Sequence, residues 1–292
     1  MTPEEFSAIC KLNPEESAAL NEILKEPELV EWAHLIADQC FIPDEMGKEP
    51  ELPEGEALSK AWFAAVYFGA EAAKEHYRKK GLPLNVFFDS MTDITAWLRN
   101  TKRNYGVIGI AKGRSWQTNL YRGIVTRHGR LECNTECFYD GPELKDENGE
   151  ILVQQGAPLI QLHIPEDGPM DMESCGRSMK RMAEFFAAYR PDYHWTGFHC
   201  ASWLLDAQLV PMLSEHSNIM KFRRLGYNYP IDIKSDTVFR VFGTADPFTV
   251  ENPTSLQRNI VEFLRKGGEF LEGGMFIPRH EIESVDYDLE KL

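Results

Sequence analysis

The chain has 292 residues, and its 31 Lys and Arg against 46 Asp and Glu give a formal net charge of −15. This balance argues against a generic binder of nucleic acid or of anionic membranes, because such binding needs a positively charged face. Hydrophobic residues make up 43% and aromatic residues 11% of the sequence, enough to build buried cores and unlike a disordered chain. At about 150 residues per domain, this length predicts two domains.

The first residues, Met1 to Phe6, offer neither the basic nor the apolar region of a secretory signal. The most apolar stretch, residues 61–70, is shorter than the ~20 residues that cross a bilayer. The six cysteines are scattered rather than dense, and Cys133 and Cys137 lack a second pair at zinc spacing. We therefore expect a cytoplasmic protein with reduced thiols, no membrane partner and no metal.

The first third of the sequence has the pattern of helices. Asn13 is a good N-cap residue, and residues 57–79 are rich in Ala, Glu and Lys before Gly81 and Pro83 end the segment. Apolar residues then recur at spacings of three and four, at Leu84, Phe87, Phe88, Met91, Ile94 and Leu98. This pattern predicts an all-helical N-terminal domain over residues 1–104.

The pattern changes after Gly106. Residues 121–126 and 131–138 predict a hairpin. A strand over 158–165, a helix over 172–186 capped by Asp171, and a strand over 193–200 follow. Beyond them we expect a short helix over 203–210, strands over 218–225, 236–242 and 270–277, and a helix over 255–266. This order predicts an α/β (α+β) domain over residues 105–292, with a mixed sheet and a right-handed crossover.

Charge is unevenly distributed. Residues 1–60 contain 15 acids and 4 bases, whereas the segment from Arg99 to Leu131 contains eight bases and no acid. The basic segment can pair with the acidic N-terminal region, or it can receive an anionic ligand such as a phosphate. Arg122, and Arg223 further along the chain, are candidates for the second role.

Two predicted strand ends carry side chains suited to chemistry. In open α/β sheets, ligands bind beyond the carboxyl ends of parallel strands. If the two strands pair in parallel, His163 and the corner from His199 to Ser202 fall at one end of the sheet. Histidine is suited to proton transfer near neutrality, and Cys200 could be a nucleophile or an acid. The alternatives are a hydrogen-bonded histidine, a buried Cys200 that only packs, and Ser202 as a helix cap.

Several runs carry a resemblance to a known family. The runs are Leu162-His163-Ile164-Pro165, Gly168-Pro169, Phe198-His199-Cys200-Ala201-Ser202-Trp203-Leu204-Leu205-Asp206, Ser217-Asn218-Ile219 and Gly129-Arg130-Leu131-Glu132. With the helical first third, the sequence resembles bacterial acyltransferase-domain proteins that join a helical N-terminal domain to a GNAT-like C-terminal domain. The resemblance covers nearly the whole chain.

This resemblance implies a GNAT-like sheet and transfer of an acyl group from acyl-CoA to an amine or hydroxyl of a small-molecule acceptor. In that interpretation His163 is the base, Cys200 an acid, and His199 a second candidate base. Ser202 is a further candidate catalytic residue. Gly168 and Ser202 would contact the acyl-CoA co-substrate, and Arg122 and Arg223 its phosphates.

Two other functions remain open from the sequence. Residues 165–171 contain two prolines and three acids, where classical GNAT proteins have a glycine-rich loop for the pyrophosphate. This loop suggests a non-catalytic GNAT-like protein that binds a ligand or a partner. A weaker alternative is a hydrolase that uses Cys200 with His163 or His199.

Overall fold

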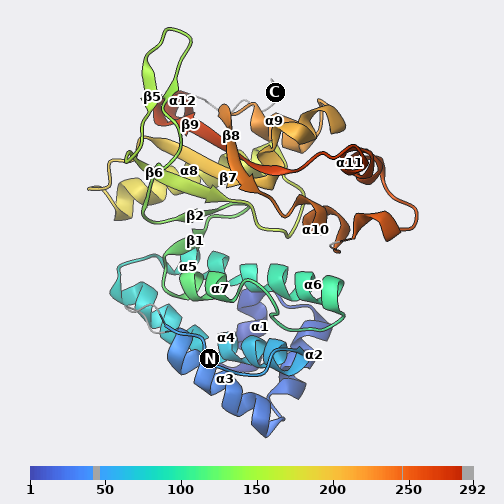
Figure 1. Cartoon of the computed structure of the whole chain (residues 1–292). Helices are drawn as coiled ribbons and strands as arrows, with labels where there is room; N and C mark the ends of the chain where they lie inside the picture. Colours follow the sequence, from blue (N-terminus) through green and yellow to red (C-terminus); the bar gives the residue numbers. More distant parts are fainter. Residues whose placement is uncertain (42–46, 245, 285–292) are drawn as a thin grey trace. The chain divides into compact units, whose positions relative to one another are not determined.

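The structure is a computed structural model that describes residues 1–41, 47–244 and 246–284 (Figure 1). Contacts divide the chain into two compact units. The helical unit comprises residues 1–135 and 164–168, and the sheet unit comprises residues 136–163 and 169–292. Each unit is described by itself. The domain boundary expected near residue 104 stays a prediction, since contact units need not be folding domains.

The helical unit contains seven helices among its described residues. They are α1 (Pro3–Cys10), α2 (Pro14–Ile23), α3 (Pro27–Cys40), α4 (Glu56–Lys79), α5 (Leu84–Met91), α6 (Asp93–Tyr105) and α7 (Arg114–Tyr121). Helix α2 begins as expected, because the Asn13 side chain accepts a hydrogen bond from the Glu16 amide at 2.9 Å. The Glu16 side chain in turn accepts one from the Asn13 amide. The long helix α4 is buried almost all round between Ala61 and Val66, which makes it the centre of this unit's core.

A short hairpin completes the helical unit. Strand β1 (Val125–Arg127) pairs antiparallel with β2 (Glu132–Asn134), and Thr126 lies opposite Cys133. The connection at residues 128–131 falls where the sequence predicts a hairpin loop. Both strands are mostly buried, and they carry Arg127 and Glu132 into the interior.

The sheet unit is built around two parallel strands. Strand β6 (Pro158–His163) pairs in parallel with β7 (Gly197–Ser202), with Leu162 opposite Cys200. Strand β9 (Leu271–Pro278) pairs antiparallel with β7, and β8 (Tyr227–Lys234) pairs antiparallel with β9. The short β3 (Cys137–Phe138) pairs antiparallel with β6. Helix α8 (Met172–Tyr189) makes the crossover between β6 and β7 (Figure 1). This mixed sheet confirms the expected fold class.

The two faces of the β6–β7 pair have different neighbours. One face carries Phe198 and Cys200, and Cys200 lies near Cys175 of α8. The other face carries His199 and, by strand alternation, Leu159 and Gln161 of β6. Leu159 belongs there to an aromatic core of Tyr139, Val153, Tyr229 and Phe276. This core includes residues of the β4 (Leu144–Lys145) and β5 (Ile151–Val153) hairpin.

Three short segments differ from the expectations. Residues 218–225 hold helix α9 (Asn218–Arg223) rather than a strand, because the Ser217 side chain caps the Met220 amide. Residues 236–242 hold helix α10 (Thr237–Phe242) rather than a strand. Strand β8, which carries Pro230, was not expected at all. The remaining elements among the described residues are the 3-10 helices η1 (Trp203–Leu205), η2 (Ala207–Met212) and η3 (Pro247–Thr249), helix α11 (Ser255–Arg265) and helix α12 (Arg279–Ser284).

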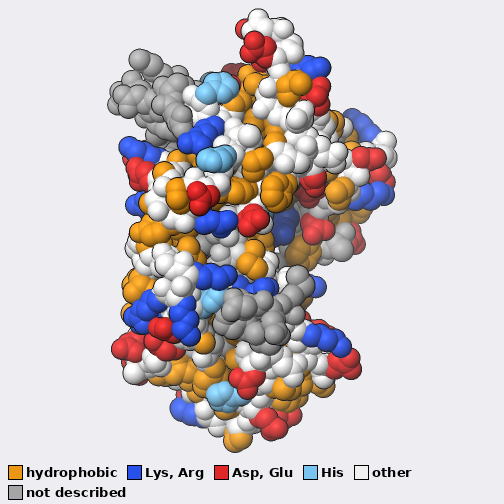
Figure 2. Space-filling model, turned by 90° about the vertical axis from the view of Figure 1, so that its left-hand side faces the viewer, with side chains coloured by type: hydrophobic (Ala, Val, Ile, Leu, Met, Phe, Trp, Pro, Cys, Tyr) orange, Lys and Arg blue, Asp and Glu red, His pale blue; other side chains and the backbone are white. Residues whose placement is uncertain are grey.

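No helix within the described ranges is both long and apolar enough to cross a membrane. On the face that Figure 2 displays, acidic and basic side chains are interspersed among apolar ones.

Asp206 ties two parts of the sheet unit together, and its removal should be costly. Its carboxylate accepts from the Gln208 amide at 2.9 Å and from the Leu271 amide at 2.8 Å, and the side chain is only 3% exposed. We expect Asp206→Ala to lower the free energy of unfolding by about 2 kcal/mol, because a buried amide loses its acceptor. Urea denaturation measures this change.

The matched control is Asp246→Ala. Asp246 caps the Phe248 amide at 3.0 Å in the same way, but it is exposed. Its loss should cost less than about 1 kcal/mol, since water replaces the bond. Equal losses in the two variants would contradict the structural role given to Asp206.

Candidate active site

The candidate site lies at the carboxyl end of the β6–β7 pair. The parallel pairing of these strands ends at Leu162 and Cys200, whereas β7 continues to pair with β9 as far as Ser202. The expectation that the two strands run side by side in parallel is therefore confirmed. His163, the last residue of β6, follows Gln161 by two positions, so it shares a face with His199.

His199 is buried in a group of aromatic side chains. Its Nε2 is 2.7 Å from the Tyr229 hydroxyl, and the two rings stack at a centroid distance of 6.1 Å. The Tyr139 ring meets the His199 ring edge-on at 5.5 Å. His199 is 4% exposed, so these contacts fix its ring against the sheet.

Both histidines are neutral at physiological pH. The pKa of His163 is lowered to about 4. Burial is the main cause of this shift, and the nearby His199 contributes a smaller part of it. Burial also lowers the pKa of His199 to about 4, although Asp140 opposes this change. Each ring therefore keeps a lone pair on one nitrogen, as a general base requires.

Cys200 has the surroundings of a packing residue. It is 1% exposed and lies on the face of β7 opposite His199. Burial raises the pKa of its thiol to about 12, with smaller contributions from Glu272 and Cys175. A thiol in this state supplies almost no thiolate at neutral pH.

Ser202 and Arg223 make local structural bonds. The Ser202 hydroxyl accepts from the Leu204 amide at 3.2 Å and so begins η1. The Arg223 guanidinium donates to the Leu205 carbonyl, which ties α9 to η1. Burial lowers the pKa of Arg223, because the charged guanidinium loses part of its hydration. Ser202 thus acts as the N-cap of η1, and Arg223 connects α9 to η1 by a hydrogen bond.

Residues 164–168, which follow β6, belong to the helical unit, and their acids are paired with arginines of the same unit. Asp167 forms ion pairs with Arg127 and, at 3.5 Å, with Arg130. Glu166 pairs with Arg103 at 2.5 Å. Arg130 also donates to the Pro165 carbonyl at 3.0 Å and to the Gly168 carbonyl at 2.9 Å. Because arginines compensate these charges, the negative electrostatic potential around Glu166 and Asp167 is much weaker than the loop sequence alone suggests.

Much of the remaining basic segment is also paired inside the helical unit. Arg99 contacts Glu16 at 3.3 Å, and Lys102 contacts Glu15. The carbonyl of Arg122 lies 3.2 Å from Nε2 of His76. Arg99 and Lys102 thus show the pairing with the acidic N-terminal region that the sequence allows.

A second cluster of charge is buried beneath β2. Asp93 and Glu132 are 2% and 1% exposed, and burial raises the pKa of both carboxyl groups. The Trp97 indole donates to Asp93 at 2.8 Å, and the Trp116 indole donates to Glu132 at 3.1 Å. Burial and the Asp93 charge raise the pKa of Glu132 well above its ordinary value, although Arg127 opposes them. The interior thus disfavours the ionised form of Glu132.

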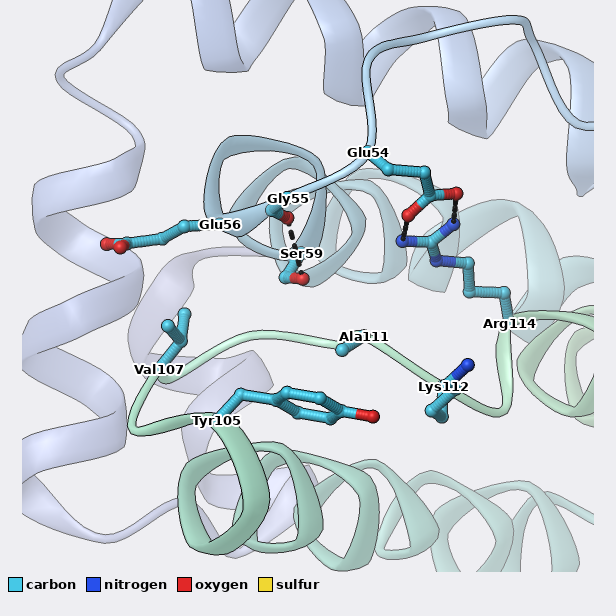
Figure 3. Close-up of a pocket in the computed structure, with 9 residues that line it drawn as sticks. All are labelled: Glu54, Gly55, Glu56, Ser59, Tyr105, Val107, Ala111, Lys112 and Arg114. Atoms are coloured by element: carbon cyan, nitrogen blue, oxygen red, sulfur yellow. Dashed lines mark hydrogen bonds and ion pairs between the residues drawn. The ribbon is translucent and has the colours of Figure 1, made fainter. Parts of the chain in front are cut away.

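A cavity of about 410 Å³ opens at the start of α4 in the helical unit (Figure 3). Tyr105, Val107 and Ala111 form its apolar side. On one side of the cavity Arg114 donates to both carboxylate oxygens of Glu54, at 3.0 and 3.2 Å. Glu56 pairs with Lys60 at 2.7 Å. Glu54 and Glu56 are thus each paired with a base of the chain, and Lys112 lies exposed at the edge.

No group of three or more His, Cys, Asp or Glu side chains suited to a metal ion occurs within the part of the chain that the structure describes.

Sequence reasoning missed the tyrosines at the site. Tyr229 lies on β8, and Tyr139 follows β3 directly. The alternation of Tyr227 and Tyr229 was a strand signal, but Pro230 next to it argues against a central strand. The arginine partners of Asp167 were also missed, although the acid-free stretch from Arg99 to Leu131 pointed to charges in need of partners.

Comparison with known proteins identifies the family. The sequence profile of the GNAT-like C-terminal domain matches residues 125–276, and that of the N-acyltransferase N-terminal domain matches residues 1–123. The chain belongs to this family of N-acyltransferase proteins with a GNAT-like C-terminal domain. A search of curated protein sequences found no significant match.

Solved structures share the fold over nearly the whole chain. A mutant acyltransferase in complex with octanoyl-CoA has a TM-score of 0.71 at 20% identity and covers 94% of this chain and 87% of its own. An acyltransferase in complex with decanoyl-CoA has a TM-score of 0.68 at 21% identity, with coverages of 94% and 86%. A third, in complex with decanoyl-CoA and teicoplanin, has a TM-score of 0.64 at 21% identity, with coverages of 95% and 99%. These matches confirm the GNAT-like fold.

Removing the partner of Arg127 should destabilise the protein. Its side chain is 7% exposed and that of Asp167 is 15% exposed. We expect Asp167→Asn to lower the free energy of unfolding by about 3 kcal/mol, because a buried guanidinium loses its counter-charge. Glu166→Gln, which breaks the exposed pair with Arg103, is the control and should cost less than about 1 kcal/mol. Similar urea midpoints for the two variants would contradict this difference.

The two histidines should make stability fall in mild acid. The unfolded chain takes up a proton on each histidine near pH 6.5, whereas the folded chain does so only near pH 4. Stability is therefore fully present above pH 6.5 and declines as the pH falls below it, by about 2 kcal/mol per histidine at pH 5. Urea midpoints measured from pH 7 to pH 5 should decline less in His199→Gln than in the wild type. Parallel pH curves would contradict the burial of a neutral His199.

Proposed function

We propose that the protein transfers an acyl group from acyl-CoA to an amine or hydroxyl of a small-molecule acceptor. The observation that carries the proposal is the parallel β6–β7 pair, whose pairing stops at Leu162 and Cys200 with two neutral histidines on one face. Family membership and the acyl-CoA complexes of the structural neighbours support it.

The chemistry is a direct transfer between two bound substrates. The acceptor nitrogen or oxygen attacks the thioester carbonyl carbon, its proton passes to an imidazole, and the C–S bond breaks with CoA leaving as a thiolate that then takes up a proton. Holding both substrates together lowers the entropic part of the barrier. His163 or His199 supplies the base, directly or through water. A backbone amide near the end of β6 would polarise the thioester carbonyl.

We assign Cys200 a packing role in this reaction. Its thiol faces α8 rather than the histidines, and a pKa of about 12 makes it a poor acid for a CoA thiolate. The same burial disfavours the Cys200 hydrolase.

The acyl-CoA phosphates need a loop that does not repel them. The ion pairs of Glu166 and Asp167 with arginines remove much of the repulsion expected from the loop sequence. A Cβ at Gly168 would meet no atom of the chain within 4 Å, so the space beside this residue is open. Gly168, Ser202, Arg122 and Arg223 remain our candidate contacts for the co-substrate.

The class of acceptor follows from charge and from the neighbours. One neighbouring acyltransferase was crystallised with teicoplanin and another with CoA and a 10C-teicoplanin. These complexes support a small-molecule acceptor for this chain as well. The net charge of −15 favours a neutral or cationic acceptor, such as an amine, over an anionic polymer.

Calorimetry tests the first step. Titration of the full chain with octanoyl-CoA should show binding with a dissociation constant well below about 1 mM. The absence of heat at millimolar ligand would rule out the proposal.

Release of free CoA thiol tests the second step. The protein should release thiol from octanoyl-CoA faster when amine acceptors are present, and loss of the base should slow this release by about 100-fold. His163→Ala and His199→Ala are the informative variants, and His216→Ala, whose side chain is 84% exposed, is the control. Tight binding without acceptor-dependent release would instead favour the non-catalytic ligand-binding alternative.

A further inference from the structure

Strands β1 and β2 place two buried, ionisable side chains of the helical unit next to each other. The strands pair antiparallel, and Arg127 lies opposite Glu132. The His128 amide donates to the Leu131 carbonyl at 2.9 Å, so the next residue pair of this ladder is joined by backbone hydrogen bonds. Because such pairs alternate along an antiparallel ladder, Arg127 and Glu132 form a pair without backbone bonds, in which side chains lie closest.

Arg127 uses only part of its guanidinium in the bonds within the helical unit. Its Nε donates to the Gly129 carbonyl at 2.8 Å, and its Nη2 donates to the Asp167 carboxylate. The third nitrogen, Nη1, is buried and has no hydrogen-bond partner among the residues that the structure describes. A buried donor without an acceptor lowers stability, because it has lost its bonds to water.

Two acceptor oxygens of neighbouring side chains are left over as well. Oε2 of Glu132 accepts from the Trp116 indole at 3.1 Å, whereas Oε1 has no partner in the described part of the chain. Gln117 is 0% exposed and donates from Nε2 to Asp93 at 3.4 Å. This bond fixes the direction of the Gln117 amide, since a carboxylate repels an amide oxygen. Its Oε1 is likewise unpartnered within the described ranges.

The three atoms without a partner belong to one buried cluster. Trp116 and Gln117 are consecutive residues of α7, and they contact Glu132 and Asp93, respectively. Asp93 and Arg127 both lie close enough to Glu132 to shift the pKa of its carboxyl. The cluster therefore offers one nitrogen that can donate and two oxygens that can accept, all shielded from bulk solvent.

We propose that the helical unit binds one internal water molecule between Arg127, Glu132 and Gln117. The water accepts from Nη1 of Arg127 and donates to Oε1 of Glu132 and to Oε1 of Gln117. These bonds satisfy all three atoms at once, and three is the usual number of hydrogen bonds for a buried water. Arg127 repels a cation at this place and Glu132 repels an anion, whereas water is neutral and both donates and accepts.

The water fits either charge state of Glu132. When the carboxyl is ionised, Oε1 accepts from the water. When it is protonated, the Trp116 indole already occupies Oε2, so the proton lies on Oε1 and is donated to the water. The water then turns so that it accepts from Glu132 and Arg127 and still donates to Gln117. The inference therefore does not depend on the pKa of Glu132.

The water site supports the arginine that holds the segment after β6. Arg127 forms the ion pair with Asp167, which belongs to residues 164–168 of the same unit. With the water on Nη1, each of the three guanidinium nitrogens of Arg127 has a partner. This role is structural, and it is independent of the proposed acyl transfer.

A high-resolution crystal structure of the full chain tests the site directly. It should show one ordered water within about 2.7–3.2 Å of Nη1 of Arg127, Oε1 of Glu132 and Oε1 of Gln117. A direct ion pair between Arg127 and Glu132, or the absence of density between the three atoms, would overturn the proposal.

Magnetic relaxation dispersion of water ¹⁷O tests the same site in solution, because it counts waters that stay inside a protein longer than it takes to tumble. The double variant with Glu132→Met and Gln117→Met removes both acceptors at similar side-chain length. It should hold about one long-lived water fewer than the wild type. Glu132→Gln is the matched control, since it removes the carboxyl but keeps a polar atom for the water, and it should retain the wild-type count.

An unchanged water count in the double variant would contradict the site. A loss of the water in Glu132→Gln would contradict the hydrogen-bonding scheme, because the amide still offers the water a partner. If the double variant fails to fold, the crystal structure of the wild type still decides the question.

Discussion

The parallel pairing of β6 with β7 is the constraint on which the sheet unit depends. Parallel neighbours need a crossover, and α8 supplies it with a stripe of buried residues that includes Cys175, Met179 and Met182. Both faces of the pair are therefore covered, by α8 on one side and by the aromatic core on the other. Only the carboxyl end remains for chemistry, and the two histidines occupy the face next to the aromatic core.

The local signals in the sequence were sufficient for most helices and for this pair of strands. Asn13 and Asp171 cap their helices through side-chain bonds, and Gly106 ends α6 in a left-handed conformation. The strands around His163 and Cys200 were recognisable because apolar runs ended at a proline or at a helix cap. Their parallel pairing followed from the helix between them.

The errors fell where a short apolar run has no clear period. Residues 218–225 and 236–242 contain β-branched and aromatic residues, yet both fold as single short helices. Strand β8 carries a proline and is found at the edge of the sheet, which is where a proline can be tolerated. Packing decided these segments, and a single sequence holds little information about packing.

The site itself was only half predictable, for a similar reason. His163 and His199 could be found because each ends or lies in a recognisable strand. Tyr229 lies 30 residues after His199 and reaches it only because β9 runs between the two strands. The partners of Asp167 likewise come from a hairpin about 40 residues earlier. Contacts of this range depend on the assembled sheet, so no local pattern announces them.

Unfolding changes the proton affinity of Glu132. Inside the helical unit, burial and the Asp93 charge hold the pKa of this carboxyl well above its ordinary value. Unfolding exposes the carboxyl to water and returns its pKa to the ordinary range. At a pH between these two pKa values the chain therefore releases protons as it unfolds, and the unfolded chain is the more negative of the two.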